Sequence, residues 1–287
     1  MEVDLLAKPP YAGLFPGELE NKKQLLASRY FSNKKFHDQP KAVLLGGQPA
    51  SGKTRLIAHL NSNTPTDFII INGDTYRELH PRYEQIQAYY GQDAPNKTQP
   101  FSNSLVEFMK EECLRRKLSF IIEGMMRTFG VIESTAKQAH EHGFLVEAHV
   151  LAVHSDDSYL GIFQRYEGEM AFYGHGRFSP LHTHDEAYHS IPGNLQKANE
   201  QQLFDRICVY RRDKTDALQP TQVATKGEEV DFSALFSQTR QPLLSATEYS
   251  QKWDVIHQQA LQRQEAAPNY LKLIADFCTK YSETKFI

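Results

Sequence analysis

One stretch of the sequence carries residues whose types and spacing suit the binding of phosphate groups. Residues 47–54 read GQPASGKT and fit the pattern G-x-x-x-x-G-K-[ST] at every fixed position. Glycines let such a loop curl so that backbone N–H groups point at phosphate oxygens at the positive end of a helix. The lysine reaches the β- and γ-phosphates, and the hydroxyl that follows it binds Mg²⁺.

The pattern therefore predicts a nucleoside triphosphate site that takes ATP and Mg²⁺. Its context supports this, because an apolar run over Lys41–Leu45 leads into the loop and a helical pattern leads out of it. An ordinary glycine-rich turn between a strand and a helix is the structural alternative. The eight positions of the loop are Gly47, Gln48, Pro49, Ala50, Ser51, Gly52, Lys53 and Thr54.

A carboxylate follows the second apolar run of the sequence. The run FIIIN at 68–72 is followed by Gly73 and Asp74. Ligands of open α/β sheets bind at the carboxyl ends of the strands, so Asp74 is a candidate base for the proton of an acceptor hydroxyl. It could equally cap the helix that follows. Position alone leaves both interpretations open.

The third apolar run also ends in chemistry-bearing residues. Glu123 closes this run and Arg127 follows four residues later, in the block EGMMR. Glu123 is a candidate for contacting magnesium through its waters or for binding the substrate. A structural ion pair between Glu123 and Arg127 is the alternative, and the sequence does not separate these readings.

Two arginines bracket a glycine-containing segment after the fourth apolar run. Arg165 lies in a helical pattern and Arg177 follows twelve residues later in the block GHGR. In nucleotide kinases of this topology the corresponding segment closes over the phosphates, where arginines stabilise the transferred group. For Arg165 alone, a solvated position on a helix surface is the alternative.

The elements that must position these residues are short buried strands that alternate with helices. Each apolar run is continuous rather than alternating, which is typical of strands covered on both faces. Strands alternating with helices predict right-handed crossovers and a parallel sheet. The predicted strands are Lys41–Leu45, Phe68–Asn72, Ser119–Glu123, Leu145–Val153 and Arg206–Tyr210.

The expected fold is therefore an α/β P-loop NTPase or kinase fold, with a mostly parallel five-stranded sheet flanked by helices. We expect a single domain over 1–287, with a core at about 41–213 and an N-terminal flank at 1–40 that includes a charged helix. The remaining residues, 214–287, begin with a polar stretch and continue with two helical patterns near 245–264 and 268–281. We interpret them as a helical extension packed on the core.

Composition excludes several classes of protein. The 287 residues carry 32 Lys and Arg against 35 Asp and Glu, a formal net charge of -3, which argues against a strongly basic nucleic-acid binder. No apolar run approaches the roughly 20 residues that span a bilayer, and the N-terminus lacks the pattern of a signal peptide. Three dispersed cysteines predict neither disulfides nor a cysteine-based zinc site. We expect a soluble protein of a reducing compartment, with no nucleic-acid or membrane partner.

A group of histidines suggests a metal site at first sight. His182 and His184 are two residues apart, and His175 lies upstream. The segment reads as a loop running into a helix, where residues at positions i and i+2 diverge. The sequence therefore does not favour metal binding here.

Six blocks of the sequence together resemble the zeta toxin family, the kinase toxins of epsilon/zeta-type toxin–antitoxin systems. The resemblance runs from about Lys41 to Asp213, with the blocks in order and at similar spacing. The second block and the spacing from Asp74 to Glu107 are its most discriminating features. The blocks are GGQPASGKT, INGDTYRELHP, QPFSNSLVE, IIEGMMRT, QRYE and LFDRICVYRRD.

The resemblance implies an ATP-dependent kinase that phosphorylates a sugar hydroxyl of UDP-N-acetylglucosamine, whose product poisons peptidoglycan synthesis in the bacterial cytoplasm. It implies a cognate small helical antitoxin of the epsilon kind, forming a heterotetramer. Asp74 matches the catalytic base and Lys53 the loop lysine, whereas Arg165 and Arg177 match the arginines that stabilise the transferred group. The positions matching those that hold the UDP-sugar are Glu107, Arg127 and Thr135.

The sequence departs from the family pattern at two positions. Ala50 stands where the loop usually has glycine, and Met125 stands where a threonine usually contacts the sugar nucleotide. The segment between Arg165 and Arg177 is also about one residue shorter than in relatives. The loss of a hydroxyl could redirect the choice of acceptor. The identity of the sugar is therefore less determined than the reaction type.

Two alternatives share the same phosphate loop. One is a kinase for another small molecule, such as an antibiotic phosphotransferase. The other is a non-enzymatic switch that signals its nucleotide state to a partner. The candidate base and the two arginines favour a kinase, because a switch needs no base for an acceptor hydroxyl.

Overall fold

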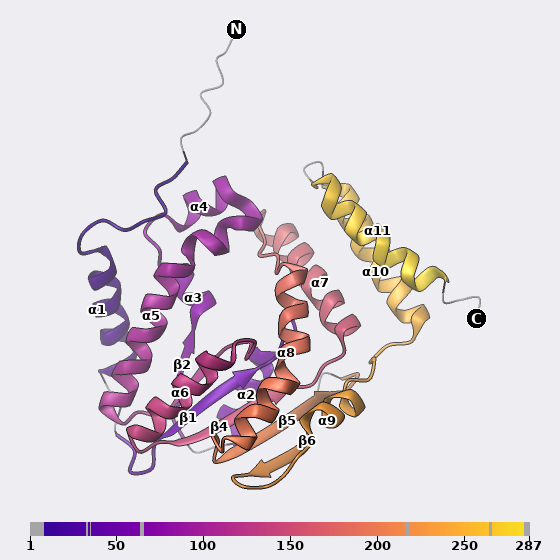
Figure 1. Cartoon of the computed structure of the whole chain (residues 1–287). Helices are drawn as coiled ribbons and strands as arrows, with labels where there is room; N and C mark the ends of the chain where they lie inside the picture. The colour runs from indigo at the N-terminus through magenta and orange to yellow at the C-terminus, as the bar shows by residue number, and fades with distance from the viewer. Residues whose placement is uncertain are drawn as a thin grey trace. The chain divides into compact units, whose positions relative to one another are not determined.

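The computed structural model of the chain describes residues 9–32, 34, 36–63, 66–215, 218–263 and 266–283 (Figure 1). Each strand in its first half is followed by one or more helices, as the sequence predicts. The elements are α1 (Glu18–Phe31), β1 (Lys41–Gly46), α2 (Lys53–Asn63), β2 (Ile69–Asn72), α3 (Gly73–Arg77), α4 (Tyr83–Tyr90), the 3-10 helix η1 (Gly91–Asp93), α5 (Ala94–Arg116), β3 (Phe120–Glu123), α6 (Phe129–Glu141), β4 (Leu145–Leu151), α7 (Ser155–Tyr173), α8 (Leu181–Glu200), β5 (Arg206–Arg212), β6 (Leu218–Thr225), α9 (Phe232–Thr239), α10 (Ala246–Gln262) and α11 (Pro268–Glu283).

The sheet is mixed and has six strands among the described residues, in the order β2-β3-β1-β4-β5-β6. Its first five strands in chain order are those predicted, with ends shifted by no more than two residues. β2 pairs with β3 in parallel, and β4 pairs with β5 in parallel. The mostly parallel α/β fold is thus confirmed.

The sixth strand, β6, is absent from the sequence prediction, which counts five strands and treats this stretch as polar. β6 pairs antiparallel with β5 at the edge of the sheet, with an irregular register between Val209 and Tyr210. Its sequence, LQPTQVAT, has no apolar run and contains a proline at position 220. Proline is tolerated at a sheet edge because one side of an edge strand needs no N–H donor. An edge strand therefore leaves little sequence signal.

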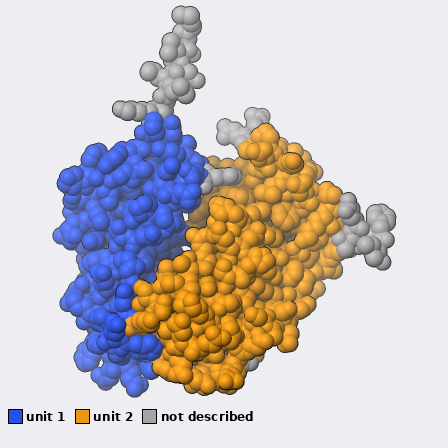
Figure 2. All heavy atoms as spheres, in the orientation of Figure 1, with its two compact units in different colours: residues 1–43, 66–123, 138–145 blue, residues 44–65, 124–137, 146–287 orange. Residues whose placement is uncertain are grey.

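The chain divides into two compact units, coloured separately in Figure 2. Unit 1 comprises 1–43, 66–123 and 138–145, and unit 2 comprises 44–65, 124–137 and 146–287.

Unit 1 is built around α5 and the paired strands β2 and β3. Leu105, Met109 and Cys113 of α5 are fully buried, at the spacing of one helix face. Figure 1 shows α1 beside α5, and the two helices pack together. The register of β2 and β3 places Asn72 opposite Glu123, so both strands end their pairing at the same level.

An arginine clamp holds the start of the described chain in unit 1. Arg82 forms a bidentate ion pair with Glu18, with N–O distances of 2.8 and 2.9 Å. Its guanidinium also donates to the carbonyl oxygens of Tyr11 and Gly13 and lies 4.8 Å from the ring centroid of Phe15. Hydrogen bonding from Arg82 lowers the pKa of the Glu18 carboxyl to about 2. The segment before α1 is therefore held by one side chain.

Unit 2 contains α2, most of α6 and the helices from α7 to α11, with an aromatic core formed by residues outside the sheet. Every residue of β4 after Leu145 is buried, as its continuous apolar sequence predicts. The two predicted C-terminal helices form α10 and α11, which lie side by side in Figure 1, and α10 packs on α7. Phe163 of α7 and Trp253 of α10 are fully buried in the shared cluster, with Phe277 of α11 packed against them. The C-terminal helices thus pack on the helix that carries Arg165.

In the part of the chain that the structure describes, no helix combines the length and the apolar character that crossing a membrane requires.

Candidate functional site

The side chains singled out by the sequence are divided between the two units. Unit 1 carries Asp74 on α3, Glu107 on α5 and Glu123 at the end of β3. Unit 2 carries the phosphate loop between β1 and α2, together with four further candidates. These are Arg127 before α6, Thr135 on α6, Arg165 on α7 and Arg177 in the loop between α7 and α8.

The phosphate loop has the tight backbone that its glycines predict. Gly52 has a φ of 103°, in a region that favours glycine. A Cβ on Gly47 would lie 2.4 Å from Ser51 Oγ, so a side chain at this position would collide with the loop. Lys53 Nζ donates to the carbonyl oxygens of Gly47 and Gln48, at 2.9 and 3.2 Å. The lysine therefore lies over the loop that would cradle the phosphates.

Ala50 adopts the left-handed conformation that its position requires, with a φ of 59°. A left-handed backbone costs an alanine about 1–2 kcal/mol relative to the right-handed form. Its methyl group lies against Gly161 of α7, where an added Cβ would come within 3.1 Å of it. The loop keeps its shape despite the departure from glycine, and the neighbouring helix leaves room for the methyl group.

The side chain of Gln48 anchors the phosphate loop to the segment after β4, a contact that the sequence did not predict. Its side chain is fully buried, and Nε2 donates to Val153 O at 2.8 Å and to Ser158 Oγ at 3.1 Å. Ser158 Oγ in turn lies 2.8 Å from His184 Nε2. Burial lowers the pKa of His184, which favours its neutral form in this network.

This network also accounts for the histidine segment. Helix α8 begins at Leu181, so His182 and His184 lie on a helix, as predicted. The Nδ1 atom of His184 lies 2.9 Å from Asp185 Oδ1. Among the described residues, no three histidine, cysteine or acidic side chains gather as a metal site.

Asp74 lies in the first turn of the short helix α3, directly after β2. The helix is capped by Asn72, whose Oδ1 accepts from the backbone N–H of Asp74 at 2.8 Å and of Thr75 at 3.4 Å. The capping role that the sequence left open for Asp74 therefore belongs to Asn72. Asp74 is 45% exposed at its side chain and forms an ion pair with Arg77 at 3.2 Å.

Asn72 also reaches the next strand. Its Nδ2 donates to Glu123 Oε2 at 2.8 Å, as their opposed positions in the register allow. One amide side chain thus connects the turn that carries Asp74 with the carboxylate of Glu123. In unit 2, Arg127 Nη1 donates to Glu186 Oε2 at 2.8 Å.

Glu107 and Thr135 occupy contrasting environments. Glu107 is 58% exposed on α5 and pairs at 2.5 Å with Lys110, whose side chain is only 3% exposed. The carboxylate is accessible, while the lysine beneath it is enclosed by the helix packing. Thr135 is buried on α6, at 4% exposure.

The two arginines after β4 flank the end of α7 and the loop that follows it. Helix α7 ends at Tyr173, and Gly174 closes it with a φ of 74°. Arg165 Nη2 donates to Ser179 Oγ at 2.8 Å, across the loop. The backbone N–H of Arg177 donates to Glu169 Oε2 at 2.6 Å. Arg165 through its side chain and Arg177 through its backbone are therefore both tied to the same helix–loop segment.

A buried ion pair next to Arg165 was missed by sequence reasoning. Glu167, two residues on, accepts two hydrogen bonds from Arg263 at 2.8 and 3.1 Å and one from Tyr270 OH at 2.6 Å. Burial raises the pKa of the Tyr270 hydroxyl, which keeps it protonated as the donor. Arg263 and Tyr270 lie about 100 positions later in the sequence. No local pattern could have paired them with Glu167.

Comparison with known proteins points to one family. The zeta toxin family model matches residues 25–223. Toxin PezT of Streptococcus pneumoniae serotype 4 is 31% identical over 210 residues, which cover 72% of this chain and 83% of that protein. Toxin zeta of Enterococcus hirae is 32% identical over 201 residues, which cover 70% of each chain.

Solved structures with a similar fold include toxin–antitoxin proteins. A chain from the characterization of the PezAT chromosomal toxin–antitoxin system of Streptococcus pneumoniae aligns with a TM-score of 0.73 at 24% identity, covering 88% of this chain and 98% of that one. A chain of the AvrRxo1-ORF1:-ORF2 complex aligns with a TM-score of 0.55 at 17% identity, covering 96% and 87%. A further structure of that complex, solved with ATP, aligns with a TM-score of 0.51 at 17% identity over 92% and 82%.

Proposed function

Since this chain belongs to the zeta toxin family of toxin–antitoxin systems, we propose that it transfers the γ-phosphate of ATP to a sugar hydroxyl of UDP-N-acetylglucosamine or a related UDP-sugar. A kinase-like fold and ATP binding accord with this membership. The phosphorylated sugar nucleotide would inhibit peptidoglycan synthesis in the bacterial cytoplasm. This would make the chain the toxin of a type II system.

One observation carries the proposal: the family match spans the phosphate loop and every candidate site residue, from Gly47 to Arg177. A generic phosphate loop alone would support only nucleotide binding. The loop, the carboxylate after β2 and the two arginines after β4 occur together in this one matched region. That combination favours phosphoryl transfer to an acceptor over a nucleotide switch.

For ATP, we propose that the loop from Gly47 to Thr54 wraps the phosphates and that Lys53 contacts the β- and γ-phosphates. The tight curl of the loop, in which a Cβ on Gly47 would collide with Ser51 Oγ, supports a loop that surrounds the phosphates with its backbone. Thr54 is exposed at the start of α2 and offers the hard oxygen donor that Mg²⁺ prefers. A bound Mg²⁺ would neutralise charge on the phosphates.

For the acceptor, we propose that Asp74 takes the proton of the sugar hydroxyl. Glu107, Glu123, Arg127 and Thr135 would hold the UDP-sugar. The exposure of Glu107 and of Asp74 supports roles that require contact with a ligand. Arginine carries a planar fork that suits phosphate oxygens, so Arg127 suits a nucleotide diphosphate.

For the transferred group, we propose that Arg165 and Arg177 neutralise its developing charge. Such arginines account for a large share of catalysis in phosphoryl transfer. The anchoring of both residues to the end of α7 and its following loop supports a shared role. A segment of this kind can close over bound phosphates and exclude water.

An antitoxin partner accords with membership of the family, and a solved structure similar to this chain comes from the PezAT toxin–antitoxin system. We propose a small helical antitoxin of the epsilon kind that blocks the ATP site, in a heterotetramer. We further propose that one kinase domain comprises both units. Its core would cover about 41–213, with a flank at 1–40 and a helical extension at 214–287.

The function is tested by incubating the purified chain with Mg²⁺-ATP and a panel of UDP-sugars. We expect at least one UDP-amino sugar to gain the mass of one phosphate, as detected by mass spectrometry. A Lys53→Met variant serves as the inactive control. If no UDP-sugar is phosphorylated while an antibiotic acceptor is, the small-molecule phosphotransferase is the better account. Expression of the wild-type chain should also arrest bacterial growth unless the antitoxin is co-expressed.

A restored hydroxyl at position 125 should improve the use of UDP-N-acetylglucosamine. Met125 is half-buried and departs from the threonine of the family pattern. A neutral hydrogen bond contributes about 0.5–1.5 kcal/mol, so Met125→Thr should raise kcat/KM for this substrate about threefold to tenfold. Steady-state kinetics would measure the change. Val131→Thr, at a position that is 63% exposed on α6, is the control. An unchanged or lower kcat/KM in Met125→Thr would argue that the chain prefers a different sugar.

A further inference from the structure

We propose that Arg77 is a positioning residue for the base Asp74, which it holds in a fixed orientation against the start of α5. This inference rests on the proposed function, in which Asp74 takes the proton of the acceptor. The residue is outside the set that sequence reasoning singled out. The signal was present in the sequence, because Arg77 follows Asp74 by three positions on a short helix.

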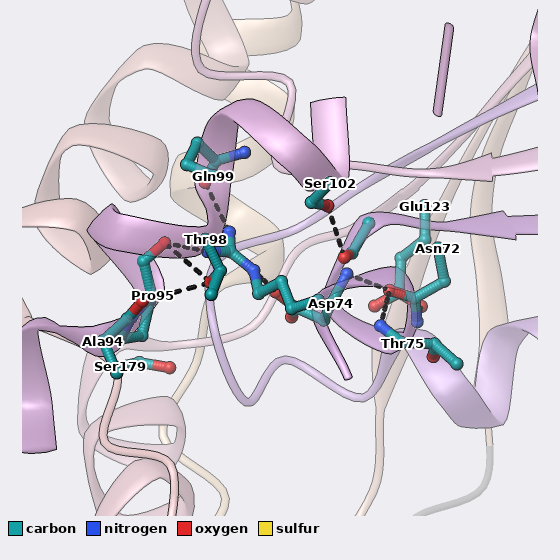
Figure 3. A network of polar contacts seen from close by, with 12 residues as sticks. Asn72, Asp74, Thr75, Ala94, Pro95, Thr98, Gln99, Ser102, Glu123 and Ser179 are labelled. Carbon is teal, nitrogen blue, oxygen red and sulfur yellow. Dashed lines mark hydrogen bonds and ion pairs between the residues drawn. The ribbon is translucent and has the colours of Figure 1, made fainter. Parts of the chain in front are cut away.

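The guanidinium of Arg77 joins two helices. Its Nε donates to Asp74 Oδ1 at 3.2 Å, within α3. Its Nη1 donates to the carbonyl oxygen of Pro95, and its Nη2 donates to Gln99 Oε1, both in the first turns of α5. Figure 3 shows Pro95 and Gln99 on one side of this network and Asp74 on the other. Each nitrogen of the planar fork is thus assigned to a contact.

The exposed fractions of the two side chains indicate that Arg77 is the fixed partner and that Asp74 is the one it orients. The Arg77 side chain is 12% exposed, whereas Asp74 is 45% exposed. An exposed pair at positions i and i+3 contributes little by itself, because two mobile side chains must be ordered to form it. Here α5 already fixes the guanidinium. The carboxylate of Asp74 therefore meets a donor whose position and direction are set before any substrate arrives, which is the condition for a well-oriented base.

A second contact connects the same two helices. Ser102 Oγ of α5 donates to the carbonyl oxygen of Gly73 at 2.5 Å, and a Cβ on Gly73 would lie 3.0 Å from that hydroxyl. The backbone before Asp74 is thus held by α5, as its side chain is held through Arg77. The same helix carries Glu107, the proposed sugar ligand, on a later turn. One rigid element would therefore set both the base and a substrate contact within unit 1.

The test is a double-mutant cycle on phosphorylation of the UDP-sugar found to be the acceptor. The variants are Arg77→Gln, Asp74→Asn and the combination of both. Loss of orientation should lower kcat about 10²-fold in Arg77→Gln, with KM for ATP within about threefold of wild type. Because Arg77 acts through Asp74, the double variant should be no slower than Asp74→Asn alone. Arg77→Lys keeps the charge but not the fork, so it should recover only part of the rate.

Arg82→Gln is the matched control. Arg82 lies five residues further on, is 14% exposed and also joins two segments through an ion pair, but it contacts Glu18 rather than Asp74. The Arg82→Gln substitution should lower the melting temperature of the protein without changing its kcat. A wild-type kcat in Arg77→Gln, or additive losses in the double variant, would overturn the positioning role while leaving the proposed function intact. A wild-type chain that phosphorylates no UDP-sugar would instead remove the proposed function, and the inference with it.

Discussion

Replacing Asp74 by asparagine should lower kcat for sugar phosphorylation by about 10²–10⁴-fold, the range typical for loss of a general base. Asparagine keeps the size of the side chain and a hydrogen-bonding oxygen but cannot accept a full proton. The side chain lies on α3, and its backbone N–H is bound by the Asn72 cap, which the substitution leaves unchanged. The dissociation constant for ATP, measured by titration calorimetry, should therefore stay near the wild-type value.

The control for this experiment is Asp67→Asn. Asp67 is also an aspartate of unit 1, and it lies just before β2, outside the proposed site. Its side chain is 66% exposed and forms an ion pair with Lys34. Its kcat should equal that of the wild type, and expression of this variant should still arrest growth. Expression of Asp74→Asn should not. If Asp74→Asn turned over at the wild-type rate, another group would have to accept the proton.

Replacing Trp253 by alanine should lower the free energy of unfolding by about 3–5 kcal/mol, as for other large aromatic residues removed from a core. Trp253 is fully buried on α10. Its ring stacks on Phe277 of α11 with centroids 4.3 Å apart and meets Phe163 of α7 edge-on at 5.0 Å. The substitution would therefore open a cavity among three helices, and α7 carries Arg165 two residues from Phe163.

The free energy of unfolding of the wild type and of Trp253→Ala is measured by urea unfolding, followed by far-UV circular dichroism. Trp253 is the one tryptophan of the chain, so fluorescence could not be compared between wild type and variant. Val255→Ala, at a 56% exposed position of the same helix, should change stability by less than about 1 kcal/mol. A loss of similar size in both variants would show that α10 responds to any truncation rather than to loss of this packing.

The buried strands and the long helices could be predicted because each shows one clear pattern of apolar residues, a continuous run or a helical period. Five apolar runs correspond to β1–β5, and helical patterns correspond to α1, α10 and α11. The strand β6 could not be found, since its edge position requires neither an apolar run nor a proline-free sequence. Helix α3 is five residues long and shows no periodicity, so its cap, Asn72, was not distinguished from Asp74.

The residues that support the candidate site were less accessible to sequence reasoning. Gln48 lies within the predicted loop, but its partners, Val153 and Ser158, lie more than 100 positions away. The pairing of Glu167 with Arg263 and Tyr270 is equally distant. Hydrogen bonds of this kind form only where distant segments pack together. The periodicity of a single sequence does not show which segments these are.

The sequence by itself determined the α/β fold class and the family of this protein, and it named the candidate residues of the site. The loop pattern, the carboxylate after β2 and the arginines after β4 are local patterns, because each must follow the end of a strand or begin a helix. Tertiary structure alone decided what holds them: that Asn72 rather than Asp74 caps α3, that Arg77 is fixed by α5, and that the C-terminal helices pack on α7. The physical reason is that a residue type suffices to name a donor or a charge, whereas its direction is set by partners brought close only when distant segments pack together.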